Sequence, residues 1–167
     1  MCLHRIVRTF SNTKHGVFPS KNGDFPGRIP RIGFGYKITS MDFNSRRRNP
    51  YHSIDEDFFI KSNQWYIAKQ EIVQTESGYW YPSGFHIFLR LKDAIIFSKK
   101  LSGCYGNTIE LISYQSPICA GFERKRTVID YVDIPTVVCE KILFHYPVVK
   151  FYPGKITVYE NRSSHNV

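Results

Sequence analysis

The sequence predicts a single α+β domain, built mainly from an antiparallel sheet or a partly open barrel with one principal helix on one face. Aromatic residues make up 16% of the 167 residues, and such rings favour pleated, half-buried strands. Short segments of alternating apolar and polar residues fill most of the chain, whereas a helical period is clear in one place. A chain of this length is ordinary for one domain.

The expected strands follow a period of two and are bounded by turn residues. They cover residues 34–39, 64–70, 85–89, 108–114, 118–122, 127–132, 137–144 and 155–159. Residues 76–83 contain Gly78 and Pro82 and are expected to form a loop. The last five strands follow the helix, and this order favours an antiparallel sheet or partly closed barrel.

The principal helix is expected at about residues 91–101. Asp93 lies in its first turn and Lys99 and Lys100 in its last, which suits the helix dipole. Its apolar residues share one side, namely Leu91, Ala94, Ile95 and Leu101.

Three regions are expected along the chain. Residues 1–33 are basic and rich in glycine and proline, which indicates an N-terminal arm or loop packed on the body. Residues 34–160 form the α+β domain, and residues 161–167 form a polar tail. The apolar runs are far shorter than a membrane span, and no secretory signal is recognisable, so we expect a cytoplasmic protein without a membrane partner.

The charge balance indicates an acidic partner. Lys and Arg number 23 against 14 Asp and Glu, a formal net charge of +9. Such a field attracts nucleic acid, a nucleotide or an acidic protein face, although it can also serve solubility alone. No cofactor is expected, because neither a phosphate-binding loop nor a dinucleotide fingerprint is present.

Two basic clusters and a group of rings are the candidate binding residues. Cations neutralise phosphates, and exposed rings stack on bases. The same residues would also fit solvated loops and an aromatic core. The candidates are Arg46, Arg47, Arg48, Arg124, Lys125 and Arg126 with Tyr79, Trp80, Tyr81 and His86; Trp65 is a further ring to test.

The cysteines are expected to be thiols. Cys2, Cys104, Cys119 and Cys139 are widely spaced, and a chain of this size needs no disulfide. Cys119 and Cys139 lie among apolar residues and are expected in the core. We expect no metal site, because no pair of ligands has a zinc-binding spacing.

An enzyme remains an alternative. Removal of the initiator Met1 would leave Cys2 with a thiol beside a free amine, the arrangement of an N-terminal nucleophile. His86 enters a strand from an aromatic loop, and alternation would place it opposite Phe85 and Ile87, where it could act as base or acid. A hydrogen-bonded structural histidine fits the same position.

Several short motifs resemble a loose group of small uncharacterised proteins from phages, prophages and bacteria. They are Met1-Cys2-Leu3, Gly35-Tyr36-Lys37, Asn49-Pro50-Tyr51, Gly84-Phe85-His86 and Lys92-Asp93-Ala94, in this order. The group lends no established activity. The resemblance implies a protein of a virus or mobile element, where small basic domains often bind and block a host component.

These observations favour a non-enzymatic binding module that engages a nucleic acid, a nucleotide signal or a host nucleoprotein in order to block or sequester it. The alternatives are a small hydrolase or transferase that uses Cys2 with His86, and a structural protein that assembles with itself.

Overall fold

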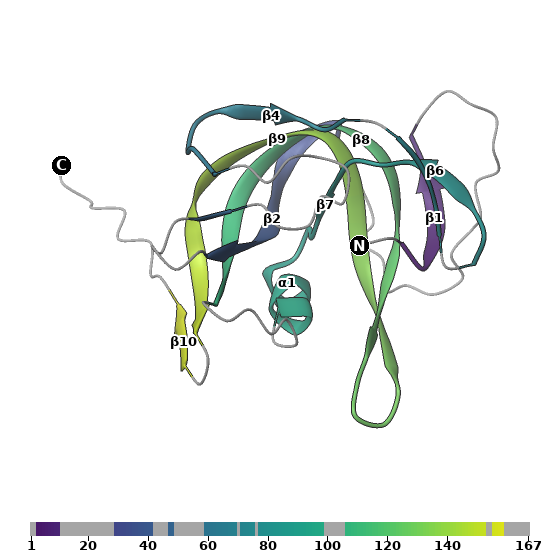
Figure 1. Ribbon diagram of the computed structural model, residues 1–167. Coiled ribbons are helices and arrows are strands. Elements are labelled where there is room, and N and C mark those ends of the chain that lie inside the picture. Colours follow the sequence, from purple (N-terminus) through teal and green to yellow (C-terminus); the bar gives the residue numbers. More distant parts are fainter. Residues whose placement is uncertain are drawn as a thin grey trace.

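The computed structural model describes residues 3–10, 29–41, 47–48, 59–69, 71–75, 77–98, 106–152 and 155–158. Most of these residues belong to antiparallel strands (Figure 1). The strands of the main sheet are β1 (Arg5–Thr9), β2 (Ile32–Met41), β3 (Arg47–Arg48), β4 (Trp65–Ile67), β7 (Phe85–Ile87), β8 (Asn107–Arg126), β9 (Tyr131–Tyr152) and β10 (Lys155–Val158). A separate hairpin consists of β5 (Ile72–Gln74) and β6 (Trp80–Pro82).

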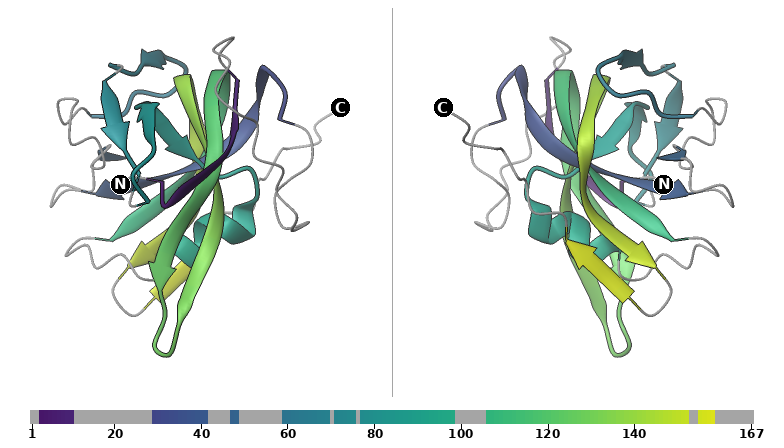
Figure 2. Two further views of the ribbon diagram at one scale, coloured as in Figure 1. Left: turned by 90° about the vertical axis from the view of Figure 1, so that its right-hand side faces the viewer. Right: turned by 90° about the vertical axis from the view of Figure 1, so that its left-hand side faces the viewer.

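The two longest strands, β8 and β9, form the centre of the sheet. They pair along almost their whole length and end in a turn at residues 127–130 that projects from the body (Figures 1 and 2). Shifts in register interrupt the ladder at three places, and bulges of this kind bend a strand and increase its twist. The first half of β8 pairs with β2, and the second half pairs with β1.

The sheet curls into a half-barrel, and an isolated bridge joins Tyr36 to Phe88 across it. The Tyr36 amide donates to the Phe88 carbonyl at 2.7 Å, and the Phe88 amide donates to the Tyr36 carbonyl at 2.8 Å. Phe88 directly follows β7, which pairs with β9 at Val137–Cys139. Backbone hydrogen bonds therefore connect β2 to β8, β8 to β9, β9 to β7, and the residue after β7 back to β2. The prediction of a mainly antiparallel, curled sheet is confirmed.

The helix α1 (Leu91–Ser98) is the one helix among the described residues, and it lies within the expected range 91–101. Residues 99–101 lie outside the described part of the chain. The Arg90 guanidinium donates two hydrogen bonds to the Asp93 carboxylate in the first turn of the helix. Ala94 and Phe97 are buried in a cluster with Ile38 and Ile109, so α1 covers this part of the sheet.

A second apolar cluster fills the barrel and includes Phe85, Ile112, Tyr114 and Phe144. Gly33 makes room for one of these rings, because a Cβ atom there would lie 2.8 Å from the Tyr114 hydroxyl oxygen. Cys119 and Cys139 are buried and free, as predicted. The other two cysteines, Cys2 and Cys104, lie outside the described residues.

Some predicted boundaries were wrong. Residues 127–130 form the tight turn of the β8–β9 hairpin, in which the Thr127 hydroxyl accepts a hydrogen bond from the Asp130 amide. The expected strands 108–114 and 118–122 are one strand, because Ser116 adopts a positive φ of 54° without ending β8. The expected loop 76–83 contains β6, and the expected arm contains β1. No helix in the described ranges is long and apolar enough to cross a membrane.

Candidate nucleic-acid interface

The predicted site residues lie in separate parts of the molecule. Tyr79 and Trp80 are exposed at the β5–β6 hairpin, whereas Tyr81 and His86 are buried. The second basic cluster lies at the end of β8. Arg47 and Arg48 form β3, of which only the backbone is described, and Arg46 and Cys2 lie outside the described residues.

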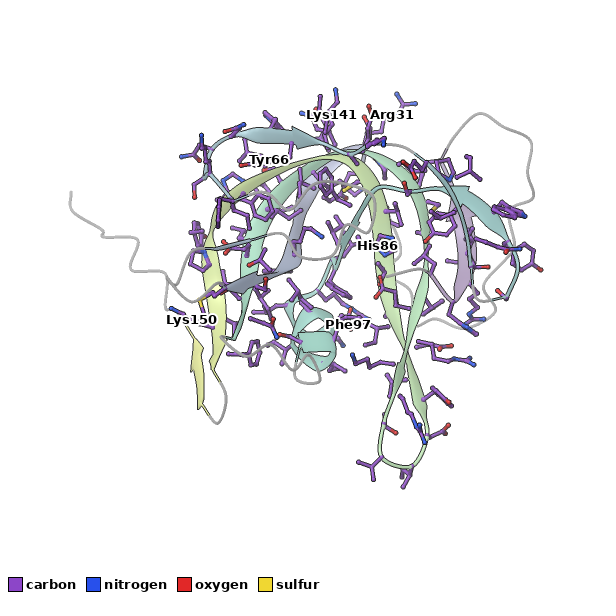
Figure 3. The ribbon with its side chains drawn as sticks, viewed as in Figure 1. Arg31, Tyr66, His86, Phe97, Lys141 and Lys150 are labelled. Carbon is purple, nitrogen blue, oxygen red and sulfur yellow. The ribbon has the colours of Figure 1, made fainter. Side chains whose placement is uncertain are left out.

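His86 belongs to a buried polar cluster inside the fold (Figure 3). Its Nδ1 atom lies 2.5 Å from Oε1 of Glu123, and the two side chains are 8% and 2% exposed. The Lys37 ammonium donates to the His86 carbonyl oxygen at 3.2 Å. The cross-strand partner of Lys37 is Glu110, which is fully buried and lies 3.4 Å from the Thr39 hydroxyl.

Burial dominates the electrostatics of this cluster. Loss of hydration lowers the pKa of Lys37 to about 8, although the nearby Cys139 and Glu123 act in the opposite direction. Burial raises the pKa of Cys119 to about 12 and also raises the pKa of Cys139. Both thiols are therefore protonated at neutral pH and are poor nucleophiles.

His86 lies on the side of β7 opposite Phe85 and Ile87, as the alternation predicted, but this side is also enclosed. The ring packs near Tyr81 and contacts Glu123, which fits the alternative of a hydrogen-bonded structural histidine. Tyr81 is also in the interior, where its hydroxyl oxygen accepts a hydrogen bond of 3.0 Å from the Leu3 amide. Neither residue offers a surface for stacking on a ligand.

The basic cluster of the hairpin is partly neutralised within the protein. Arg124 donates from Nε to Asp133 at 3.1 Å, and its guanidinium lies 5.6 Å from the centre of the Tyr131 ring. The Lys125 ammonium lies 4.7 Å from the centre of the Phe97 ring. Much of the charge that the sequence concentrates here is therefore used in local contacts.

A different surface combines exposed rings with cations. Four strands, β2, β8, β9 and β4, lie side by side in the register of their hydrogen bonds. Directly opposite residues on neighbouring strands point to the same side of a sheet. Two adjacent rows result: Ile32, Gln115, Lys141 and Ile67 in one, and Phe34, Ser113, Leu143 and Trp65 in the other. We call these eight positions the outer face.

The apolar residues of the outer face are unusually accessible. Phe34 is 67% exposed and Trp65 is 40% exposed, at opposite ends of one row. Ile32 and Ile67 are each 65% exposed at the ends of the other row. The residues between the rows point inward: Tyr114 and Ile142 are fully buried, and Tyr66 packs on the core. Exposed apolar residues gathered on one face of a sheet indicate an interaction surface.

Two cations border these rings without a carboxylate partner in the described part of the chain. Lys141 belongs to the outer face, and Arg31 directly precedes Ile32; Figure 3 shows both on the outside of the curved sheet. Other cations are engaged, as Lys69 is with Glu71 and Arg90 is with Asp93. The eight positions of the outer face contain no acidic residue.

His145 supports one end of this surface. Its ring lies 5.8 Å from the Phe34 ring, measured between centres, and its Nε2 atom lies 2.7 Å from the Ser113 hydroxyl. The Phe34 ring is therefore contacted by His145 and still largely accessible.

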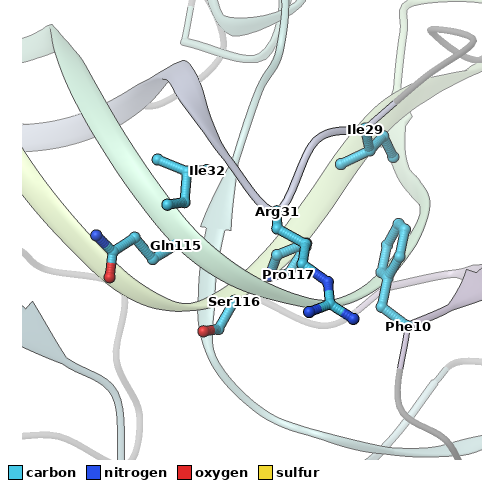
Figure 4. A pocket seen from close by; sticks show the side chains of 7 residues that line it. All are labelled: Phe10, Ile29, Arg31, Ile32, Gln115, Ser116 and Pro117. Atoms are coloured by element: carbon cyan, nitrogen blue, oxygen red, sulfur yellow. The ribbon is translucent and has the colours of Figure 1, made fainter.

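A pocket of about 580 Å³ opens beside the outer face and shares Ile32 and Gln115 with it. Its other apolar walls are Phe10, Ile29 and Pro117, and its other polar residues are Arg31 and Ser116. Figure 4 shows the Arg31 side chain extending between Phe10 and Ser116. The Arg31 carbonyl oxygen accepts the Ser116 amide at 3.1 Å, which ties the two pocket strands together.

The chain matches no protein-family model, no curated protein and no solved structure. Within the described residues, no group of three or more His, Cys, Asp or Glu side chains could hold a metal ion. The arrangement of the outer face and its pocket is suited to binding by stacking and by charge.

Sequence reasoning missed most of the outer face. Of its rings, the sequence singled out Trp65 alone. The alternation of Ile32 and Phe34 with Gly33 and Gly35 is the available signal, because glycines at two successive inward positions leave the bulky residues of this segment on the other side. The cations went unnoticed because Arg31 and Lys141 are single residues, not clusters.

Proposed function

We propose that this protein is a binding module that holds single-stranded nucleic acid across the outer face. One observation carries the proposal: exposed rings at the two ends of a sheet row lie beside cations that have no carboxylate partner among the described residues. This combination provides both a stacking platform and phosphate contacts.

The geometry favours unpaired bases over a duplex. Three strand spacings, about 14 Å, separate the backbones of Phe34 and Trp65 along their row. Flat rings on an open sheet can stack only on bases whose faces are accessible, as they are in single strands. Arg31 and Lys141 lie at the side of this row and can contact the phosphates of a strand that crosses it.

The net charge of +9 supports the same partner, because it attracts a polyanion over long range. The resemblance to phage and prophage proteins remains a prediction. If it holds, the bound strand belongs to the host or to the mobile element, and binding blocks or sequesters it.

The proposal is tested by removing the two rings together. The Phe34→Ala/Trp65→Ala variant is expected to bind a fluorescent oligouridine or oligothymidine of about 12 nucleotides roughly a hundredfold more weakly, because each stacked ring contributes about 1–3 kcal/mol. Fluorescence anisotropy at constant salt measures the affinity. Urea unfolding is expected to show a stability within about 1 kcal/mol of the wild type, since both residues are exposed.

Trp80→Ala is the matched control, because Trp80 is 66% exposed and belongs to the separate β5–β6 hairpin, not to the outer face. Its affinity for the oligonucleotide is expected to equal that of the wild type. A loss in Trp80→Ala with normal binding by the double variant would move the site to the β5–β6 hairpin. If the wild type binds no single strand and instead dimerises through the outer face in sedimentation experiments, the proposal is wrong.

A further inference from the structure

The pocket beside the outer face combines three kinds of group in one place. Phe10 and Pro117 provide flat apolar walls, Gln115 provides an amide, and Arg31 provides a cation. Its volume of about 580 Å³ lies in the range of small-molecule sites. An apolar ligand would not use the arginine, and a simple inorganic anion would not use the walls.

These groups match the parts of one nucleotide. A base fits between apolar walls and stacks on a ring. The Gln115 amide can both donate to and accept from the edge of a base, and the Ser116 hydroxyl can do the same for a sugar. The guanidinium of Arg31 has the fork geometry that binds a phosphate through two hydrogen bonds.

The position of the walls is fixed by the fold. Ile29 is buried in the barrel core, and Phe10 packs against the same cluster. The Phe10 amide donates to the Ile118 carbonyl oxygen at 2.9 Å, just beyond the bend of β8 at Ser116. Arg31 has no carboxylate partner among the described residues, so its charge is available to a ligand.

We propose that this pocket binds a single nucleotide, with its phosphate on Arg31 and its base between Phe10 and Pro117. The nucleotide is either a free mononucleotide or one unit of a strand on the outer face. Binding of one unit of a strand rests on the proposed function, whereas binding of a free mononucleotide does not.

The test uses NMR spectra of the full chain with adenosine 5′-monophosphate and, separately, uridine 5′-monophosphate. Saturable shifts are expected for the amides of Ile32, Gln115 and Ser116, with little change at Trp65. Arg31→Met is expected to weaken this binding by roughly tenfold or more, because it removes a charged hydrogen bond. Lys92→Met, the matched loss of an exposed cation on α1 outside the pocket lining, is expected to leave it unchanged.

Further probes identify the source and separate the two proposals. Adenosine or inorganic phosphate alone is expected to bind more weakly than the mononucleotide. If an oligonucleotide shifts the pocket amides and the mononucleotide competes with it, the pocket takes one unit of the strand. If the oligonucleotide binds the outer face but no mononucleotide shifts the pocket amides, the pocket proposal is wrong and the proposed function stands. If a mononucleotide shifts the pocket amides but no oligonucleotide binds, the pocket proposal stands and the proposed function is wrong.

Discussion

The barrel interior and the outer face use opposite chemistry on the two sides of the same strands. Inside, β2 places Lys37 beside Glu110, with Glu123 and His86 nearby, all of them buried. Outside, the same strand exposes Ile32 and Phe34 to solvent. Buried charges are costly and are kept only when they satisfy one another, whereas exposed rings contribute little to folding.

This difference separates structural residues from functional ones. The interior cluster is enclosed, with Glu123 in contact with His86 and Lys37 donating to the His86 carbonyl oxygen, so we assign it to structure. The outer face exposes Phe34 and Trp65 and includes Lys141, which has no carboxylate partner among the described residues, so we propose it for binding. Substitutions on the two sides should therefore affect different measurements, stability on the inside and affinity on the outside.

The largest effect is expected for Glu123→Ala. It removes the acceptor of His86 and a nearby countercharge of Lys37 and is expected to lower the free energy of unfolding by about 3–5 kcal/mol. Urea denaturation measures this loss. Glu71→Ala is the matched control, because Glu71 pairs with Lys69 at the surface and its loss should cost less than about 1 kcal/mol. Equal effects of the two variants would show that the interior cluster is not structural.

The next effect concerns pH and Lys37. Its folded-state pKa of about 8 lies below the ordinary value of 10.5, so the unfolded chain holds this proton more tightly than the folded one. Protonation therefore opposes folding, and the wild type gains stability relative to Lys37→Met as the pH rises from about 8 to 10.5. The gain is expected to approach roughly 3 kcal/mol.

Unfolding of both proteins by urea at several pH values measures this difference, in which the titration of other groups largely cancels. A stability difference that does not depend on pH would mean that Lys37 titrates normally.

The smallest effect is expected at the hairpin. Replacing Arg124, Lys125 and Arg126 by Gln should change the slope of log affinity against log salt by less than about 0.7, the value for one phosphate contact. The reason is that Arg124 already contacts Asp133 and Lys125 already contacts Phe97. Loss of both Arg31 and Lys141 should instead flatten the slope of log affinity against log salt by about 1.4, roughly 0.7 per contact. A larger change in the hairpin variant would place the strand there.

The fold was largely predictable because local patterns determine it. The aromatic content and the alternation in residues such as 137–144 indicated strands, and the period around Ala94 indicated the helix. The turn at residues 127–130 was misread because Val128 and Ile129 are apolar, yet they are 98% and 95% exposed at the tip of the hairpin. Residue type alone does not show that a β-favouring residue lies in a turn.

The candidate site was much less predictable. Rows across a sheet bring together Phe34 and Trp65, which are 31 positions apart, and no local pattern specifies that register. Trp80 is exposed on the separate β5–β6 hairpin and Tyr81 lies in the core, so neither belongs to the outer face. Clustered charges such as Arg124 and Lys125 attract attention in a sequence, but a carboxylate or ring contacted in the fold can satisfy them.

The β8–β9 hairpin also suggests an order of assembly. Its turn joins neighbouring residues and is held by Thr127 and Asp130, so its loop closes with little loss of chain entropy. The bridge between Tyr36 and Phe88 instead joins residues 52 positions apart. We therefore expect the hairpin to nucleate folding and the bridge to close the barrel late, so that in pulse-labelled hydrogen exchange the amides near the turn gain protection before that of Phe88.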